Sequence, residues 1–308
     1  MLTLVLGTTL FCNTKASEVK LIEVSSFEEL KKVVTDLGEA NLAHTLLVMD
    51  NDDTLTMMSC PDQNNLKTCQ YLGGPAWFSW QNSLLSTASP YRVATEFDDL
   101  LKISTLLFAI NYMEYTEEDV PTVLQSLVNS QVRLLVLTAR GTDTSAATAN
   151  QFSHHVLSGK NSKYLNFLDL ISQNALVGKK SSIPGIASPY QPCGNVKARA
   201  VSYQNGVMYV AGQNKGQMLK CLLEATDSST IQNIIFIDDT YENVKDVYEA
   251  FKTTKMANVI SIHYTALSAH KDALTTGPNA KAYQENSNRR WNAIKSVLKK
   301  ELQTPAIP

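Results

Sequence analysis

Short apolar runs, each followed by polar residues, recur at four places along the chain. Such a run predicts a β-strand covered on both faces, which is the usual form of a strand in a parallel sheet. In open α/β sheets, ligands bind beyond the carboxyl ends of the strands. The pattern predicts a doubly wound parallel sheet with chemistry at the ends of four strands, namely residues 46–49, 134–137, 207–210 and 234–237.

The first run delivers two carboxylates, Asp50 and Asp52, to the tip of its strand. Side chains two residues apart in an extended segment point the same way, so both can reach one substrate, one as nucleophile and one as proton donor. Taken alone, such a stretch is more often a solvated turn or part of a calcium loop. An EF-hand is disfavoured, because Thr54-Leu55-Thr56-Met57 follows instead of a glycine and a distant glutamate.

The other three runs end in a hydroxyl, a cation and a second carboxylate pair. Thr138 follows the second run, and Lys215 stands at a predicted helix start after the third, where the dipole favours an anion. Such a lysine indicates an anionic partner. Asp238 and Asp239 follow the fourth run. Each also has a plainer interpretation, since Thr138 or the aspartate pair can cap a helix and Lys215 can be a solvated surface residue.

The aspartate pair, threonine, lysine and second aspartate pair, in this order, resemble the four motifs of the haloacid dehalogenase-like (HAD) superfamily of phosphohydrolases. The similarity is to a secreted, functionally uncharacterised bacterial branch, and it covers residues 40–56, 130–155 and 205–265. It implies a Rossmann-like, doubly wound parallel sheet with inserted cap segments. The superfamily often has glycine where this chain has Asp53, and the sequence explains neither the turn nor the extra charge there.

The resemblance also implies a role for each residue. Asp50 would attack the phosphorus and become an aspartyl phosphate, while Asp52 would protonate the leaving oxygen and then activate water. Thr138 would donate a hydrogen bond to a phosphoryl oxygen, and Lys215 would hold both the phosphate and Asp50. An acid two residues after the nucleophile favours hydrolysis of a small phosphate ester over displacement of halide from carbon.

The implied cofactor is Mg²⁺, a hard ion that prefers oxygen ligands. Its expected ligands are Asp50, the backbone carbonyl of Asp52, and Asp238, with Asp239 binding directly or through water. Two other functions stay open. The same fold can be catalytically silent and serve as an exported binding or host-interaction protein. It can also be a phosphotransferase that passes the phosphoryl group to an acceptor other than water.

The expected core comprises residues 18–56 and 123–308. Residues 57–122 separate the first two motifs and are long enough for a helical cap, which would admit small soluble phosphates. A second insert, residues 159–205, is rich in Ser, Gly, Pro and Lys and predicts loops with short strands, as a specificity flap or an extension of the sheet. The last helix, with Trp291 and Leu298 on one face, is predicted to be an amphipathic cover.

Composition and charge narrow the partners and the location. A chain with 44% apolar and 18% charged residues is globular, and its formal charge of −2 offers no attraction to nucleic acid or anionic membranes. Residues 1–17 predict an export signal, because the apolar stretch 2–12 is too short for stable membrane insertion and Thr14-Lys15-Ala16 resembles a cleavage site. No basic residue precedes that stretch. A bacterial periplasmic or secreted location is expected, or a cytoplasmic one if this segment is not a signal.

Four cysteines remain after removal of such a signal, and they allow three pairings. A bond between Cys60 and Cys69 is favoured, because it would close the polar loop between them. A zinc site there is less favoured, since eight intervening residues exceed the usual ligand spacing. Cys221 is interpreted as a small buried apolar residue of a helix.

Three further side chains near the second motif have open interpretations. Arg140 can reach a substrate anion or form an ion pair with a cap carboxylate. His154 and His155 fall at the end of the following helix, where a cation complements the dipole, and a structural role is favoured over metal binding.

Overall fold

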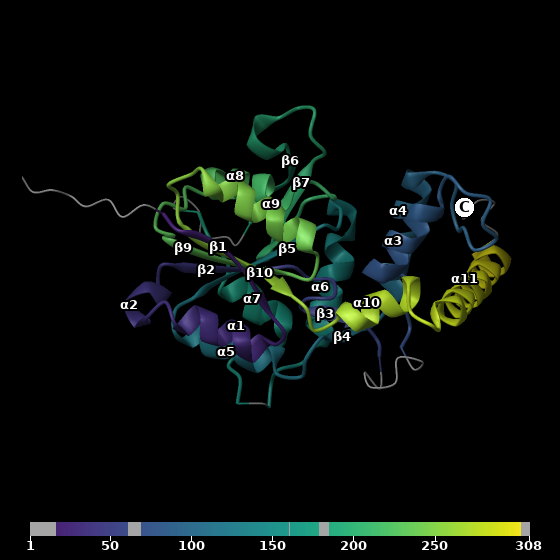
Figure 1. Cartoon of the computed structure of the whole chain (residues 1–308), viewed down its shortest axis with the longest axis horizontal. Coiled ribbons are helices and arrows are strands. Elements are labelled where there is room, and N and C mark those ends of the chain that lie inside the picture. Colours follow the sequence, from purple (N-terminus) through teal and green to yellow (C-terminus); the bar gives the residue numbers. More distant parts are fainter. Residues whose placement is uncertain (1–16, 61–68, 160, 179–184, 303–308) are drawn as a thin grey trace, which may run out of the picture.

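The computed structural model describes residues 17–60, 69–159, 161–178 and 185–302 (Figure 1). The predicted export signal lies outside this part, apart from its last residue. An eight-stranded sheet has the order β1-β10-β9-β2-β5-β8-β7-β6, and the pairs from β1 to β8 are parallel. The strand bounds in this order are Val19–Val24, Asn258–Tyr264, Asn233–Asp238, Thr45–Met49, Arg133–Thr138, Val207–Tyr209, Val201–Gln204 and Ile186–Tyr190. The prediction of an α/β fold with a largely parallel sheet is confirmed.

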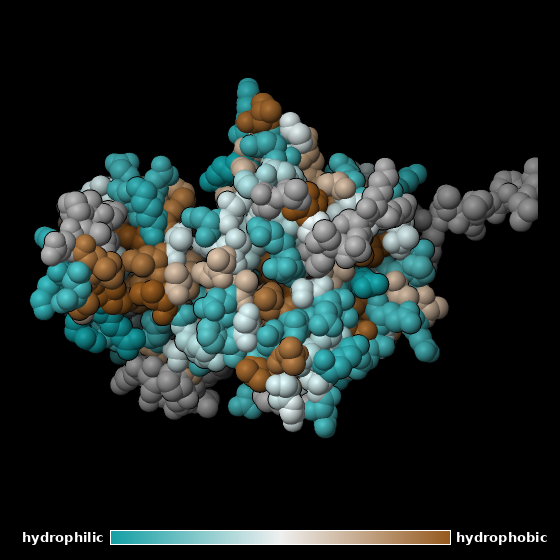
Figure 2. All heavy atoms as spheres, turned by 180° about the vertical axis from the view of Figure 1, so that it is seen from behind, coloured by the Kyte–Doolittle hydropathy of each residue, from teal (hydrophilic) through white to brown (hydrophobic). Residues whose placement is uncertain are grey.

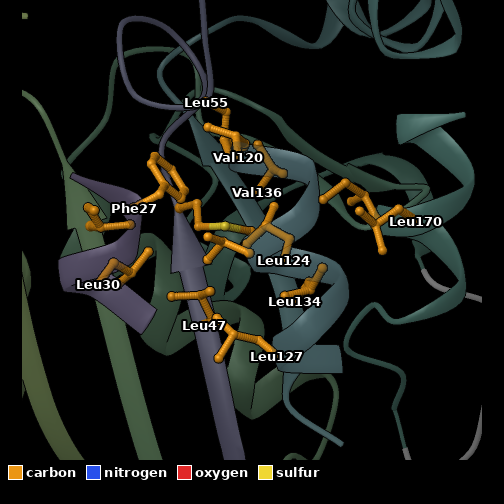
Figure 3. Packing of buried hydrophobic residues seen from close by; sticks show 14 of the residues in the cluster. Phe27, Leu30, Leu47, Leu55, Val120, Leu124, Leu127, Leu134, Val136 and Leu170 are labelled. Carbon is orange, nitrogen blue, oxygen red and sulfur yellow. The ribbon is translucent and has the colours of Figure 1, made fainter. Parts of the chain in front are cut away.

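Alternate residues of the central strands point into two separate apolar layers. Leu47 and Leu134 pack against the helices α1 (Phe27–Thr35), α5 (Val120–Asn129) and α7 (Phe167–Gln173), as Figure 3 shows for Phe27 and Leu124. Leu46 faces the opposite side, where α8 (Lys215–Ala225) and α9 (Tyr241–Lys252) lie (Figure 1). Because both faces are covered, the middle residues of β2, β5 and β9 are apolar, and polar side chains stand at the ends of these strands.

The first insert builds a second lobe beside the sheet. It contains the antiparallel strands β3 (Thr56–Met58) and β4 (Met113–Tyr115) and the helices α3 (Pro75–Leu84) and α4 (Phe97–Ile110). The helices α10 (Ser268–Thr275) and α11 (Ala280–Leu302) join the same lobe, because they share an apolar cluster with the insert. We call these six elements the insert lobe. In Figure 2 apolar side chains gather on this lobe. Phe97 and Leu101 of α4 are large apolar residues that are exposed.

The C-terminal helices therefore differ from the predicted division, which assigned residues 123–308 to the core. Trp291 of α11 and Leu274 of α10 are buried with Trp77 and Leu100 of the insert. The amphipathic face of α11 was recognised correctly in the sequence, and it packs on the first insert and on α10. Burial of two large aromatic side chains in one cluster makes the insert and the C-terminal helices a single packed unit.

The second insert extends the sheet. Along the chain, α7 is followed by β6 and β7. The strand β7 forms an antiparallel hairpin with β8, and β6 pairs antiparallel with β7 at the edge of the sheet. The short helices α2 (Glu39–Leu42), η2 (Thr142–Thr144) and η3 (Pro192–Gly194) complete the connections, together with α6 (Ser145–His154) after β5.

Two disulfides cross-link the described part of the chain. The bond between Cys60 and Cys69 was predicted, and it lies within the insert. A second bond joins Cys193 of η3 to Cys221 of α8, so the interpretation of Cys221 as a mere apolar residue is wrong. Disulfides persist in oxidising compartments, so the pair suggests an extracellular or periplasmic environment.

Among the described residues, none of the helices combines the length and the apolar character that crossing a bilayer requires.

His155 is a buried neutral side chain at the end of α6. Its ring packs on Tyr115 at 4.3 Å and against Phe167. Burial, and secondarily the neighbouring His154, lowers the pKa of His155 to about 4. The structural role predicted for it stands, but the physical reason was wrong, because a neutral imidazole does not complement the helix dipole.

Replacing His155 by phenylalanine is expected to remove a pH-dependent part of the stability. The histidine binds a proton near pH 6.5 in the unfolded chain but only near pH 4 in the folded one. As the pH falls across this interval, the free energy of unfolding of the native protein therefore decreases by up to about 3 kcal/mol. In the phenylalanine variant this decrease is absent, because the side chain does not bind a proton. Urea unfolding of both proteins at several pH values measures the difference, and an unfolding free-energy difference independent of pH would contradict the assignment.

Candidate functional site

Asp50 lies directly beyond the end of β2, between the carboxyl ends of β9 and β5. Its backbone N–H donates to the carbonyl of Ile237 at 2.9 Å, which continues the β2–β9 pairing by one step. The chain then turns tightly, since the N–H groups of Leu55 and Thr56 both donate to the carbonyl of Asn51 at 2.9 Å. This turn keeps Asp52 beside Asp50 at the same edge of the sheet.

Lys215 joins two of the predicted strand ends. Its Nζ donates to Asp50 Oδ1 at 2.5 Å and to Asp238 Oδ2 at 2.6 Å, and its side chain is 1% exposed. Lys215 is the first residue of α8, and the missing side chain of Gly216 lets this helix pack directly on the backbone of Asp246 in α9. A lysine at the positive end of a helix dipole is unfavourable by itself, and the two carboxylates provide the negative charge that compensates for it.

The charges of this cluster depend on one another. Burial raises the pKa of Asp50 well above its ordinary value, Lys215 acts in the opposite direction, and the carboxylates of Asp238 and Asp239 raise it further. Burial lowers the pKa of Lys215, but the attraction of Asp238 and Asp50 outweighs burial and raises the pKa overall. The ammonium of Lys215 is therefore the positive charge that favours the ionised forms of Asp50 and Asp238 against the effect of burial.

Asp52 is held by Arg140 in a two-pronged ion pair. Nη2 of the guanidinium donates to Asp52 Oδ1 at 2.7 Å, and Nε donates to Oδ2 at 2.8 Å. The remaining nitrogen, Nη1, donates to Thr148 and Gln151 of α6. Phe108 of α4 stacks on the guanidinium at 4.0 Å. The carboxylate partner of Arg140 is thus Asp52 and not a carboxylate of the insert, and the arginine links Asp52 to the insert lobe through Phe108.

Thr138 occupies the end of β5, facing Asp52. Its hydroxyl lies 3.5 Å from Asp52 Oδ2, which is a weak contact, and it accepts a hydrogen bond from the backbone N–H of Arg140 at 3.2 Å. The side chain is fully buried. Its position at a strand end is the one that the sequence pattern predicts, and the structure brings it to the same edge as Asp50.

Three carboxylates are close enough to hold one metal ion. Asp50, Asp238 and Asp239 each offer an oxygen, and these atoms lie within 4.8 Å of one another. All three are buried, and a donor set of carboxylate oxygens suits a hard divalent cation such as Mg²⁺. The side chain of Asp52 is outside this group.

Supporting residues hold the second aspartate pair in place. The side-chain amide of Asn243 donates to both oxygens of Asp238, and the N–H of Thr240 donates to Oδ1 at 2.9 Å. The hydroxyl of Thr54 lies 3.4 Å from Asp239 Oδ1. These contacts orient the carboxylates toward the end of β2.

Lys271 was not recognised in the sequence. It lies on α10 in the insert lobe, and its Nζ donates to Asp239 Oδ2 at 2.5 Å. No local pattern marks it, because it follows no strand and its helix packs on a distant part of the chain.

Comparison with known proteins places the whole unit in one family. A family model described as "Protein of unknown function (DUF2608)" matches residues 23–303. The chain belongs to the DUF2608 family. The DUF2608 match spans the sheet except the start of β1, covers both parts of the insert lobe, and contains every site residue described above. No curated protein matches the sequence.

Proposed function

We propose that this DUF2608 protein is a Mg²⁺-dependent phosphatase with a HAD-like site, hydrolysing a small phosphate ester through an aspartyl phosphate on Asp50. The observation that carries the proposal is the bridge of Lys215 between Asp50 and Asp238, with Asp52 next to them. Residues far apart in sequence thus supply a nucleophile, an acid, a cation and metal-binding oxygens at one sheet edge. Each feature was expected from the order of the four motifs.

In the first half of the reaction, a carboxylate oxygen of Asp50 attacks phosphorus in line. The bond between phosphorus and the leaving oxygen breaks, and Asp52 gives that oxygen a proton. In the second half, Asp52 takes a proton from water, whose oxygen attacks the phosphorus and releases phosphate from Asp50. The two halves return both carboxylates to their starting protonation states.

The surrounding residues stabilise charge and hold geometry. Lys215 binds a nonbridging phosphoryl oxygen while it remains paired with Asp238, and the hydroxyl of Thr138 donates to another. When bound by Asp50, Asp238 and Asp239, Mg²⁺ supplies charge neutralisation for the phosphoryl group. Arg140 holds Asp52, so the acid must leave one of its two hydrogen bonds to reach the leaving oxygen.

The size of the substrate follows from burial. Asp50 is 5% exposed, and α4 of the insert lobe contacts the loop after β5 through Thr105 and Asp143. A substrate reaches the nucleophile only after the insert lobe shifts, and a closed lobe leaves room for a small molecule. The disulfides support a periplasmic or secreted phosphatase.

Hydrolysis of phosphate esters by the purified protein tests the proposal. With a panel of small esters and Mg²⁺, we expect phosphate release from at least one ester, and we expect a chelator to lower its rate by about 100-fold or more. Product analysis with added alcohols separates hydrolysis from transfer to another acceptor. Magnesium binding without turnover of any ester would instead identify a catalytically silent binding protein.

A further inference from the structure

Asp53 is a buried carboxylate with an unmet hydrogen-bonding requirement. It is 2% exposed, and within the described part of the chain its Oδ2 has no hydrogen-bond partner. Its backbone is left-handed, with φ of 58°, a conformation that glycine adopts freely and aspartate tolerates. The tight turn after Asp50 therefore accounts for the backbone at this position, but it does not account for the charge.

The start of α10 lies next to Asp53. Asp53 and His270 line one cavity of about 10 Å³, together with Tyr71, whose ring stacks on His270 at 4.5 Å. Lys271 is the next residue of α10. Burial raises the pKa of Asp53 well above its ordinary value, Asp239 adds to this rise, and Lys271 acts in the opposite direction.

Lys271 also contacts the candidate metal site directly. Its Nζ donates to the side chain of Asp239 at 2.5 Å and to its backbone carbonyl at 3.3 Å. A cation bound by Asp239 and the ammonium of Lys271 are thus drawn to the same carboxylate. Since α10 packs in the insert lobe, the lysine reaches the end of β9 from outside the sheet.

A count of charges shows why this contact matters. Counted by formal charge, five acidic side chains face three cationic ones at the end of the sheet. The eight residues are Asp50, Asp52, Asp53, Asp238, Asp239, Arg140, Lys215 and Lys271. Burial raises the pKa of Asp50 and Asp53, and the neighbouring ammonium groups of Lys215 and Lys271 act against this rise, so they favour the ionised carboxylates. Without Lys271 the five acidic side chains face two cationic ones, and without the carboxylate of Asp53 four acidic side chains face three.

We propose that Lys271 is a positioning residue that the C-terminal helices supply to the site, where it offsets the charge of Asp53 and holds Asp239, and so limits the affinity for a divalent cation. The proposal rests on the proposed function, because it takes the carboxylate group to be a metal site. It names a residue of α10 that acts on the metal through Asp239.

Magnesium titration of charge variants tests the inference. Calorimetry should give a dissociation constant about tenfold lower for Lys271→Met and about tenfold higher for Asp53→Asn, with the double variant close to the native value. Lys281→Met is the matched control, since Lys281 is exposed on α11 and should leave the constant unchanged. Lys271→Arg keeps the charge and should bind Mg²⁺ like the native protein. Unchanged constants in both single variants would overturn the proposal.

Thermal unfolding without metal separates this inference from the proposed function. We expect Lys271→Met to lower the midpoint by about 4 °C, and by less than half as much in the Asp53→Asn background. Equal losses in the two backgrounds would remove the link between Asp53 and Lys271 even if hydrolysis is observed. If the drop in the midpoint is smaller in the Asp53→Asn background but the protein neither binds Mg²⁺ nor hydrolyses esters, the interaction between Asp53 and Lys271 is supported and the phosphatase function is rejected.

Discussion

Replacing Asp50 by asparagine is expected to lower Mg²⁺-dependent phosphate release by at least about four orders of magnitude, because the neutral amide cannot attack phosphorus. The substitution also removes one of three carboxylates that lie within reach of one metal ion. Shape and volume are nearly conserved, so the loss reports chemistry. Initial rates of phosphate release under saturating ester and Mg²⁺ measure the effect, with the native protein at the same concentration as reference.

A second carboxylate variant is the matched control for this experiment. Asp52→Asn should also stop turnover, yet it retains the Asp50 carboxylate and should still trap phosphate covalently, which mass spectrometry of the intact protein detects. Asp50→Asn should trap none. Turnover that survives Asp50→Asn in a folded protein would remove this residue from the nucleophilic role, and unaltered turnover in Asp52→Asn would reject that residue as the acid and base.

The strand ends were predictable because their signals are local. Each central strand is a run of apolar residues, and the sheet places all parallel carboxyl ends at one edge, so the positions of Asp50, Thr138 and Asp238 follow from the pattern alone. The prediction that Lys215 lies at the same edge came from its place in the order of the motifs. In the structure Lys215 contacts both Asp50 and Asp238.

The side-chain partners were less predictable, since they depend on packing between distant segments. Arg140 stands two residues from Thr138, but its pairing with Asp52 depends on the turn after β2 and on the stacking of Phe108 from the insert. The sequence left two other partners open for this arginine. A buried guanidinium with several hydrogen bonds is well defined in space, yet nothing in the local pattern identifies which carboxylate it meets.

The contribution of the C-terminal helices was missed for a related reason. The amphipathic face of α11 shows that the helix covers something, but periodicity does not specify which surface it covers. Because α10 and α11 pack on the insert, Lys271 of α10 lies within hydrogen-bonding distance of Asp239. Its ammonium also acts on Asp53, whose pKa it lowers against the effect of burial. The departure at Asp53 that the sequence left unexplained is thus understood only through tertiary contacts.

Removing the cation at the centre of the site should destabilise the whole protein. In Lys215→Met the carboxylates of Asp50 and Asp238 lose their buried counter-ion, and loss of one partner from a buried ion pair costs about 3–5 kcal/mol of unfolding free energy. Turnover should fall with it, because phosphate loses its cationic ligand. Urea unfolding and phosphate release measure the two effects, and Lys220→Met on the same helix is the control.

The recovery of Lys215→Met distinguishes electrostatics from packing. Methionine fills nearly the same volume, so the destabilisation arises from two carboxylates left without a positive charge. Mg²⁺ binds the same oxygens and should restore part of the unfolding free energy, whereas the control should respond to Mg²⁺ like the native protein. Lowering the pH should also narrow the deficit, because an uncompensated buried carboxylate takes up a proton and becomes neutral. A deficit that neither Mg²⁺ nor protons reduce would mean that Lys215 supports the fold through packing, and it would leave the phosphatase site without its central cation.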